Sequence, residues 1–300
     1  MKSELENRTG SKIKDYELLD ASSGERLERW GNAILIRPDP QVIWQTTKDR
    51  NIWNNVDARY IKSQTGGGAW QIPSDKNLSQ IVRYQTLKFL TKPMNFKHMG
   101  LFPEQEVNWE RIDRVIKTAG RPVKLLNLFG YTGAASLVAA KAGAKVCHVD
   151  AAKGMVTWGK ESAKLSGIEH LPIRWIVDDC TKFVKRELKR GNKYDIIVLD
   201  PPSYGKSPGN EFWHLEEDIY LLLELLKELL SEDFLMLIFN LYTTSFGIGV
   251  ARYLLQSTIG SKFECKVDVE EIGLKVKSTG LILPCGLTGM CVRSAERSKT

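Results

Sequence analysis

The sequence predicts an α/β protein whose main domain is a doubly wound, largely parallel sheet, preceded by a small antiparallel β domain. Two observations lead to this fold class. From residue 123 onward, short apolar runs alternate with segments of helical periodicity, which indicates repeated strand–helix units and a sheet covered on both faces. Between residues 26 and 100, aromatic and β-branched residues alternate with polar ones between turn residues, as in short antiparallel strands.

The expected organisation has three parts: a flexible N-terminus over 1–25, the small β domain over 26–100, and the larger domain over 101–300. In the β domain, "QIVRYQTLKFLTK" is close to strict period two. The first residues, "MKSELENRTGSKIK", lack the apolar core of a secretory signal. No run approaches the ~20 apolar residues that a membrane helix needs, so we expect a cytoplasmic protein without membrane contact.

The elements of the larger domain follow from its periodicity. A helix around 107–119 is expected, then helices near 134–143, 153–166, 181–190, 215–231 and 246–259. The intervening strands are Val123–Leu128, Lys145–Val149, Pro172–Val177, Tyr194–Leu199 and Phe234–Phe239. Two further strands, in "FECKVDVEEIG" and "GMCVRS", flank "LILPCGLTG". The prediction is therefore a seven-stranded, Rossmann-like sheet that ends in an antiparallel strand.

Charge and cysteine content restrict the class of protein. The net charge of +7 permits a polyanionic partner such as nucleic acid, although basic stretches such as "TKFVKRELKRGNK" fit solvated faces equally well. The five cysteines are odd in number and have no CxxC spacing, and the four histidines lack metal-ligand spacing. We therefore expect neither a disulfide framework nor a metal site.

The turn "NLFGYTGAAS" after the first parallel strand is the expected cofactor site. In doubly wound sheets, ligands bind beyond the carboxyl ends of the strands. Gly130 and Gly133 allow the backbone to approach a ligand closely, and Asp150 ends the next strand, where a carboxylate can accept both ribose hydroxyls. A dinucleotide would require G-x-G-x-x-G, but "GYTGAAS" has only two glycines. S-adenosylmethionine, a nucleoside without phosphates, therefore fits better than a nicotinamide or flavin dinucleotide.

The third strand ends in "RWIVDDC", where a carboxylate can accept a hydrogen bond from the adenine amine. Asp179 is the first choice and Asp178 the alternative. The structural alternative for either residue is to cap the following helix.

The fourth strand runs into "YDIIVLDPPSYGKS", the strongest local signal in the chain. Two prolines stiffen the backbone and remove two donors, which leaves carbonyl groups to point into the site. Asp200 stands at the strand end. We expect Asp200, Pro201 and Tyr204 to carry the reaction, with Asp200 also near the cofactor.

Taken together, "LLNLFGYTGAAS", "HVDAAKGMVTWGKESAKLSG", "RWIVDDCTKFV" and "DIIVLDPPSYGK" resemble class I S-adenosylmethionine-dependent methyltransferases. The sequence is most similar to the group that contains the large-subunit ribosomal RNA cytosine-5 and guanine methyltransferases. The resemblance covers roughly residues 95–295.

This resemblance implies the roles of individual residues. Gly130, Tyr131 and Gly133 would line the methionine part of the cofactor, Asp150 would hold the ribose, and Asp179 the adenine. "HMGLFPEQEVNW" is similar to the family's lead-in segment, in which Glu104 also lies. The full expected cofactor-binding set is Phe102, Gln105, Asn127, Phe129, Gly130, Tyr131, Thr132, Gly133, Asp150, Ala151, Asp179 and Asp200.

The methyl acceptor remains open between three chemistries. A base nitrogen would hydrogen-bond to Asp200 and the Pro201 carbonyl while Tyr204 stacks on the flipped-out base. C5 of a pyrimidine requires a thiolate, for which Cys285 in "LPCGLTG" is the candidate. A small molecule or protein side chain is the third acceptor. The alternative to an enzyme is a non-catalytic RNA-binding module that retains a cofactor pocket. The leading hypothesis is methylation of a base in RNA, in particular ribosomal RNA, with the β domain selecting the substrate.

Overall fold

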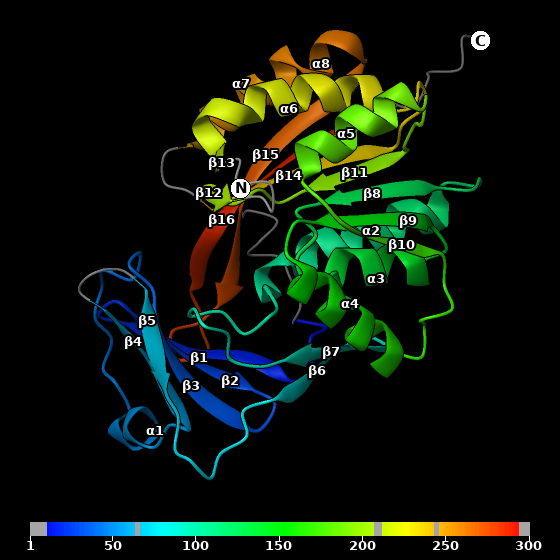
Figure 1. Cartoon of the computed structure of the whole chain (residues 1–300). Coiled ribbons are helices and arrows are strands. Elements are labelled where there is room, and N and C mark those ends of the chain that lie inside the picture. Colours follow the sequence, from blue (N-terminus) through cyan, green and yellow to red (C-terminus); the bar gives the residue numbers. More distant parts are fainter. Residues whose placement is uncertain (1–10, 64–66, 207–211, 243–245, 294–300) are drawn as a thin grey trace. The chain divides into compact units, whose positions relative to one another are not determined.

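The computed structural model describes residues 11–63, 67–206, 212–242 and 246–293, and the chain divides into two compact units (Figure 1). The first unit comprises Met1–Glu106, Glu161–Ser166 and Gly273–Pro284. The second comprises Val107–Lys160, Gly167–Ile272 and Cys285–Thr300. Among the described residues, none of the helices is both long and apolar enough to cross a membrane.

The first unit contains a five-stranded sheet in the order β1-β2-β3-β4-β5. Neighbouring strands are antiparallel except β3 and β4, which are parallel. The strands β6 and β7 form a separate hairpin whose turn residue Gln85 has a φ of 53°. The elements are β1 (Tyr16–Ser22), β2 (Glu25–Trp30), β3 (Ala33–Pro38), α1 (Arg50–Asn54), β4 (Ala58–Lys62), β5 (Gly68–Gln71), β6 (Gln80–Tyr84) and β7 (Leu87–Thr91). The expected small antiparallel β domain is confirmed, with one parallel pair added.

Regular structure begins earlier in the chain than the sequence predicted. The segment 1–25, expected to be flexible, contains β1 and the first residue of β2. The sequence of β1 lacks the alternation of apolar and polar residues that predicts a strand, because one of its buried residues is the charged Asp20. The Asp20 carboxylate accepts hydrogen bonds from Trp53 Nε1 at 2.9 Å and from Ser278 Oγ at 2.7 Å, partners far away in sequence.

A charged group lies in the core of the first unit. The carboxylate of Glu28 is fully buried and accepts hydrogen bonds from Arg37 Nη2 at 2.8 Å and from the hydroxyl of Tyr16 at 2.8 Å. Burial by itself would raise the pKa of Glu28, but the charge and hydrogen bonds of Arg37 lower this pKa to about 2. The pair is therefore ionised throughout the physiological range.

The second unit is built on a seven-stranded sheet in the order β10-β9-β8-β11-β14-β16-β15. The strands β10, β9, β8, β11 and β14 are parallel, and β16 runs antiparallel to β14. The strands are β8 (Lys124–Leu128), β9 (Lys145–Asp150), β10 (Ile173–Val177), β11 (Ile196–Leu199), β14 (Met236–Leu241), β15 (Cys265–Lys275) and β16 (Ile282–Arg293). This confirms the predicted doubly wound sheet with its antiparallel last strand.

Helices cover both faces of this sheet. Figure 1 shows α3 and α4 on one face and α5, α6, α7 and α8 on the other. Side chains of the second group pack with alternate strand residues, such as Leu199 and Phe239, in one continuous core. The helices are α2 (Glu106–Thr118), α3 (Ala134–Lys141), α4 (Lys153–Leu165), α5 (Cys180–Lys189), α6 (Leu215–Leu229), α7 (Ile248–Ser257) and α8 (Ile259–Lys262). Their positions agree with the helical periodicity of the sequence.

The end of the sheet differs from the prediction in one respect. The segment "LILPCGLTG" was expected between two strands, but most of it belongs to β16, which begins at Ile282. The strand is long because residues 287–292 pair with β14 along its whole length. Cys285 consequently lies buried in a strand rather than in a loop.

Candidate active site

The order of strands reverses at β8, which has β9 on one side and β11 on the other. The chain proceeds from β8 outward to β10 and then returns to β11. Ligands of doubly wound sheets bind at this point, beyond the carboxyl ends of the strands. Four loops follow these ends, and they carry Phe129–Gly133, Asp150 with Ala151, Asp178 with Asp179, and Asp200 to Tyr204. The second unit therefore brings most of the predicted site residues to one edge of one sheet.

The loop after β8 has an unusual backbone. Phe129 and Tyr131 have φ values of 53° and 51°, in the left-handed region that side chains rarely adopt. Such residues cost about 1–3 kcal/mol each and persist only where surrounding contacts hold them. Here the N–H of Phe129 donates to the sulfur of Cys180 at 3.2 Å, and the N–H of Tyr131 donates to Asp150 Oδ2 at 2.8 Å. Strain held in this way is typical of ligand-binding loops.

The two glycines of this loop are required for different structural reasons. Gly133 has a φ of 82° and stands at the N-cap of α3. Gly130 is required by packing, because a Cβ atom there would lie 2.4 Å from Cε1 of His148. The sequence predicted close approach of a ligand at both glycines, whereas at Gly130 the close neighbour is the side chain of His148.

A buried polar network supports the loop from beneath. Asn127 Nδ2 donates to Ser136 Oγ at 2.9 Å, and Ser136 Oγ lies 3.0 Å from Nδ1 of His148. Burial lowers the pKa of His148 to about 3, so the ring is neutral. Asn127, predicted to bind the cofactor, is buried in this network, and its approach to the cofactor remains a prediction. Ser136 and His148 were not among the predicted site residues, because their contacts join elements separate in sequence.

Asp150 stands at the end of β9 and is linked to the strained loop. Its two oxygens accept the N–H groups of Tyr131 and Ala152, each at 2.8 Å. Burial raises the pKa of Asp150, and these two hydrogen bonds only partly oppose that effect. A half-buried carboxylate in this state is stabilised further by hydroxyl donors, which fits the ribose of a nucleoside.

The paired acidic residues after β10 both have structural partners. The side chain of Asp179 accepts a hydrogen bond from the N–H of Lys182 at 2.9 Å and so caps α5. Asp178 forms an ion pair with Arg186. Asp179 therefore has the capping role that was the structural alternative. Its expected contact with the adenine remains a prediction.

The loop after β11 is held by a tryptophan that the sequence did not point to. Pro201 is buried, and the chain continues into a two-stranded ribbon of β12 (Tyr204–Lys206) and β13 (Phe212–His214). From β13, Trp213 Nε1 donates to the carbonyl oxygen of Pro202 at 2.7 Å. The ring of Trp213 also lies 5.0 Å from that of Phe129, between centroids. Trp213 thus connects the Asp-Pro-Pro loop with the strained loop after β8.

The remaining predicted residues belong to the first unit. Phe102 precedes a short 3₁₀ helix, Pro103–Gln105, in which Glu104 and Gln105 are buried. The ring of Phe102 lies 5.3 Å from that of His98, and burial with nearby Arg37 lowers the pKa of His98 to about 4. The approach of Phe102 and Gln105 to the cofactor remains a prediction.

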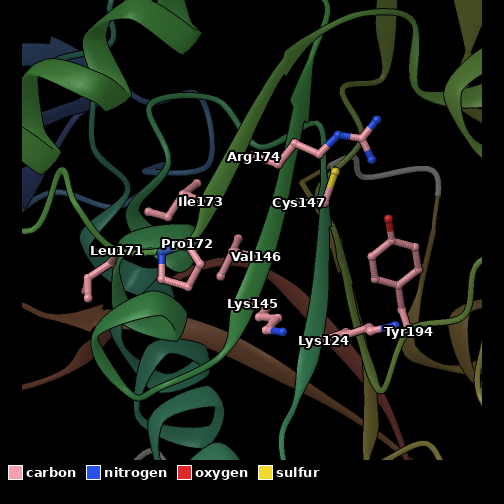
Figure 2. A pocket seen from close by; sticks show the side chains of 9 residues that line it. All are labelled: Lys124, Lys145, Val146, Cys147, Leu171, Pro172, Ile173, Arg174 and Tyr194. Carbon is pink, nitrogen blue, oxygen red and sulfur yellow. The ribbon is translucent and has the colours of Figure 1, made fainter.

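A separate cavity of about 420 Å³ lies at the opposite edge of the sheet, at the amino ends of β8, β9 and β10 (Figure 2). Lys124, Lys145 and Arg174 are among its lining residues, together with Tyr194. It shares no residue with the loops described above. Among the residues that the structure describes, no cluster of three or more His, Cys, Asp or Glu side chains is placed to hold a metal ion.

Comparisons with known proteins agree with this architecture. The model of the S-adenosylmethionine-dependent methyltransferase family matches residues 66–254. The S-adenosylmethionine-dependent methyltransferase of Agrobacterium tumefaciens has 36% sequence identity and a TM-score of 0.90, covering 95% of this chain and 92% of that one. A methyltransferase structure from Streptococcus mutans, 18% identical with a TM-score of 0.71, covers 94% of this chain and 76% of that one and supports the fold alone.

Curated relatives add a second similarity. The ribosomal RNA large subunit methyltransferase K/L of Shewanella frigidimarina is 30% identical over 243 residues, which are 74% of this chain and 33% of that protein. The protein of the same name from Pseudoalteromonas translucida is 29% identical over 179 residues, 59% of this chain and 24% of that protein. The chain spans about a quarter to a third of the length of these relatives. From the family match and the site geometry, the chain belongs to the S-adenosylmethionine-dependent methyltransferase family.

Proposed function

We propose that this protein transfers a methyl group from S-adenosylmethionine to a base in RNA, with ribosomal RNA as the leading substrate. The observation that carries the proposal is the meeting of the strained loop, Asp150 and the Asp200–Tyr204 segment at the point where the strand order reverses. The RNA substrate is supported by the names of the curated relatives, which are ribosomal RNA methyltransferases. The net charge of +7 suits a polyanionic substrate.

The cofactor would be held by residues from three of the loops. Asp150 offers a half-buried carboxylate to the ribose hydroxyls, and Asp179 lies beyond the next strand on the side expected for adenine. The loop from Phe129 to Gly133 would follow the methionine part, because its two left-handed residues are held in a fixed conformation at the end of β8. Ala151, next to Asp150, and Thr132, which is buried within the loop, are further residues of the proposed cofactor-binding set.

When bound, S-adenosylmethionine supplies a methyl group that its sulfonium already activates. The work left to the protein is to hold the acceptor in line and to exclude water. Asp200 and the carbonyl of Pro201 would accept hydrogen bonds from an N–H of the base, which orients the nitrogen toward the methyl. The register of β12 with β13 puts Tyr204 on the face opposite Trp213, so its predicted stacking on the methylated base is not part of this proposal.

The thiol-dependent route to C5 of a pyrimidine is less well supported. Cys285 is buried within β16, and the cysteine beside the candidate site is Cys180. Burial raises the pKa of Cys180 well above the ordinary value of a thiol, and its sulfur accepts the N–H of Phe129. A thiol in that setting is a poor nucleophile, since attack requires the thiolate. A nitrogen acceptor therefore remains the proposal.

We assign substrate selection to the β domain over 26–100. Its separate sheet and its own buried ion pair between Glu28 and Arg37 give it a core independent of the seven-stranded sheet. A small-molecule or protein acceptor remains the second candidate, which the experiment below separates from RNA.

The test uses methyl-labelled S-adenosylmethionine with the full chain. Unmodified ribosomal RNA, total protein and a metabolite extract are incubated separately, with Asp200→Ala as the control. Label in RNA that is lost in Asp200→Ala, while cofactor affinity stays within a few-fold, is the expected result. Label only in protein or metabolites would overturn the RNA substrate. Cofactor binding without transfer to any pool would favour a non-catalytic binding module.

A further inference from the structure

The ribbon of β12 and β13 has two chemically different faces. Its register pairs Tyr204 with His214 and Lys206 with Phe212, while Gly205 lies opposite Trp213. Directly paired residues of antiparallel strands share a face, and residues two apart do so as well. Tyr204, Phe212 and His214 therefore lie on one face, which we call the aromatic face, and Trp213 lies on the other.

The Trp213 face is engaged with the protein itself. Its indole N–H binds the carbonyl of Pro202, and its ring packs beside Phe129. These contacts hold the ribbon against the two loops of the candidate site. The aromatic face is consequently turned away from those loops.

The aromatic face is open to solvent. The side chains of Tyr204 and Phe212 are each 55% exposed, although both are large and apolar. Their ring centroids lie 5.8 Å apart at an interplanar angle of 33°, and the ring of His214 meets Tyr204 edge-on at 5.0 Å. Exposed rings gathered on paired strands resemble the platforms on which proteins stack unpaired bases.

We propose that the aromatic face stacks unpaired RNA nucleotides that flank the methylated base. The inference rests on the proposed function, because it assigns the flanking strand of the same substrate. The aromatic face is continuous with the Asp-Pro-Pro loop after β11, since only three residues separate Tyr204 from Asp200. In a duplex the base faces are hidden by their neighbours, so the aromatic face selects single-stranded RNA.

The charges beside the ribbon indicate which part of the nucleotide makes contact. Glu216, Glu217 and Asp218 lie in the first turn of α6, which begins directly after His214. Three carboxylates disfavour a phosphate at that position. The bases, rather than the sugar–phosphate backbone, are therefore the groups that meet the aromatic face, while the overall positive charge of +7 attracts the strand.

The test measures RNA binding without methyl transfer. Fluorescence anisotropy is recorded with a labelled, unstructured RNA of about 12 nucleotides and with its duplex, at one fixed salt concentration. Phe212→Ala is expected to weaken single-strand binding roughly 5- to 150-fold, the range for loss of one stacked base. Phe212→Trp keeps a stacking surface and should bind like the wild type. The matched control is Tyr253→Ala, which removes an aromatic ring that is 72% exposed on α7.

Equal affinity of Phe212→Ala and Tyr253→Ala, or a preference of the wild type for duplex RNA, would overturn the inference. Weakening by Phe212→Trp as severe as by Phe212→Ala would also overturn it, because the effect would then not be stacking. If RNA is methylated with the same KM by Phe212→Ala and wild type, the inference fails and the proposed function stands. If single-stranded RNA binds through Phe212 but is never methylated, the proposed function fails instead.

Discussion

The indole nitrogen of Trp213 and the carbonyl oxygen of Pro202 are joined by a 2.7 Å hydrogen bond. This bond fixes the second proline of the Asp-Pro-Pro segment from a strand that lies eleven residues further along the chain. Because the same ring packs beside Phe129, one side chain sets the geometry of the two loops that meet where the strand order reverses.

Trp213→Phe should lower kcat for methyl transfer by about 10- to 100-fold, because small displacements of positioning groups are costly in this type of reaction. The phenyl ring keeps the contact with Phe129 but cannot bind Pro202, so the KM for S-adenosylmethionine should change little. Steady-state kinetics at varied cofactor concentration measures both parameters. A wild-type kcat in Trp213→Phe would show that the hydrogen bond has no positioning role.

Asp150→Ala should weaken S-adenosylmethionine binding by about 1–3 kcal/mol, the cost of losing a charged hydrogen-bond acceptor. The variant also leaves the N–H groups of Tyr131 and Ala152 without their carboxylate, so the melting temperature should fall as well. Titration calorimetry gives the affinity. Asp150→Asn keeps a carbonyl oxygen, so its affinity for S-adenosylmethionine should lie between those of the wild type and Asp150→Ala. An unchanged affinity in Asp150→Ala would contradict the ribose assignment.

Gly130→Ala should destabilise the protein by about 1–3 kcal/mol through overpacking. The new methyl group would lie 2.4 Å from the ring of His148, which is fully buried and hydrogen-bonded to Ser136 and so cannot move aside. Thermal unfolding measures the effect.

Gly154→Ala is the matched control for this substitution. Gly154 lies in α4, and no atom falls within 4 Å of the position of an added Cβ. Alanine there should stabilise the helix by about 0.5–1 kcal/mol. Equal melting temperatures for the two variants would contradict the account of Gly130.

Glu28→Gln should destabilise the first unit by about 3–5 kcal/mol at neutral pH, because it leaves the buried guanidinium of Arg37 without a counter-charge. The folded-state pKa of Glu28 is lowered from 4.5 to about 2, so the unfolded state binds the proton more tightly. The stabilisation is therefore complete above pH ~4.5 and is lost as the pH falls toward 2.

Denaturant unfolding of wild type and Glu28→Gln between pH 7 and 3 checks this dependence. The difference in unfolding free energy between the two proteins should narrow below pH ~4.5, because Glu28 of the unfolded wild-type chain becomes protonated there while the folded-state carboxylate stays ionised. A difference that stays constant over this range would mean that Glu28 does not titrate with the lowered pKa.

Several parts of the site were predictable because they depend on local pattern. The parallel strands, the glycine-bearing turn, and the acidic residues at the ends of β9, β10 and β11 all follow from short stretches of sequence. Apolar runs of strand length bounded by turn residues have few alternatives in a chain of this composition. The order of the elements then places Asp150 and Asp200 at the same edge of the sheet.

Other features depend on contacts between distant segments, which no local pattern records. The strand β1 contains a buried aspartate, and its polar residues satisfy their hydrogen bonds with Trp53 and Ser278. The last strand is longer than its apolar pattern because it pairs with β14 over residues 287–292. The role of Asp179 as a helix cap likewise depends on where α5 begins.

The amino-acid sequence alone determined the fold class, the cofactor and the edge of the sheet at which the predicted site residues lie, because periodicity and turn residues act over a few neighbouring positions. The tertiary structure alone decided why Gly130 must be glycine, which side chain Asn127 binds, and which residue holds the Asp-Pro-Pro segment. Each of these depends on a partner from another element, His148, Ser136 or Trp213. Packing and hydrogen bonding across space select such partners, and their spacing along the chain carries no signal.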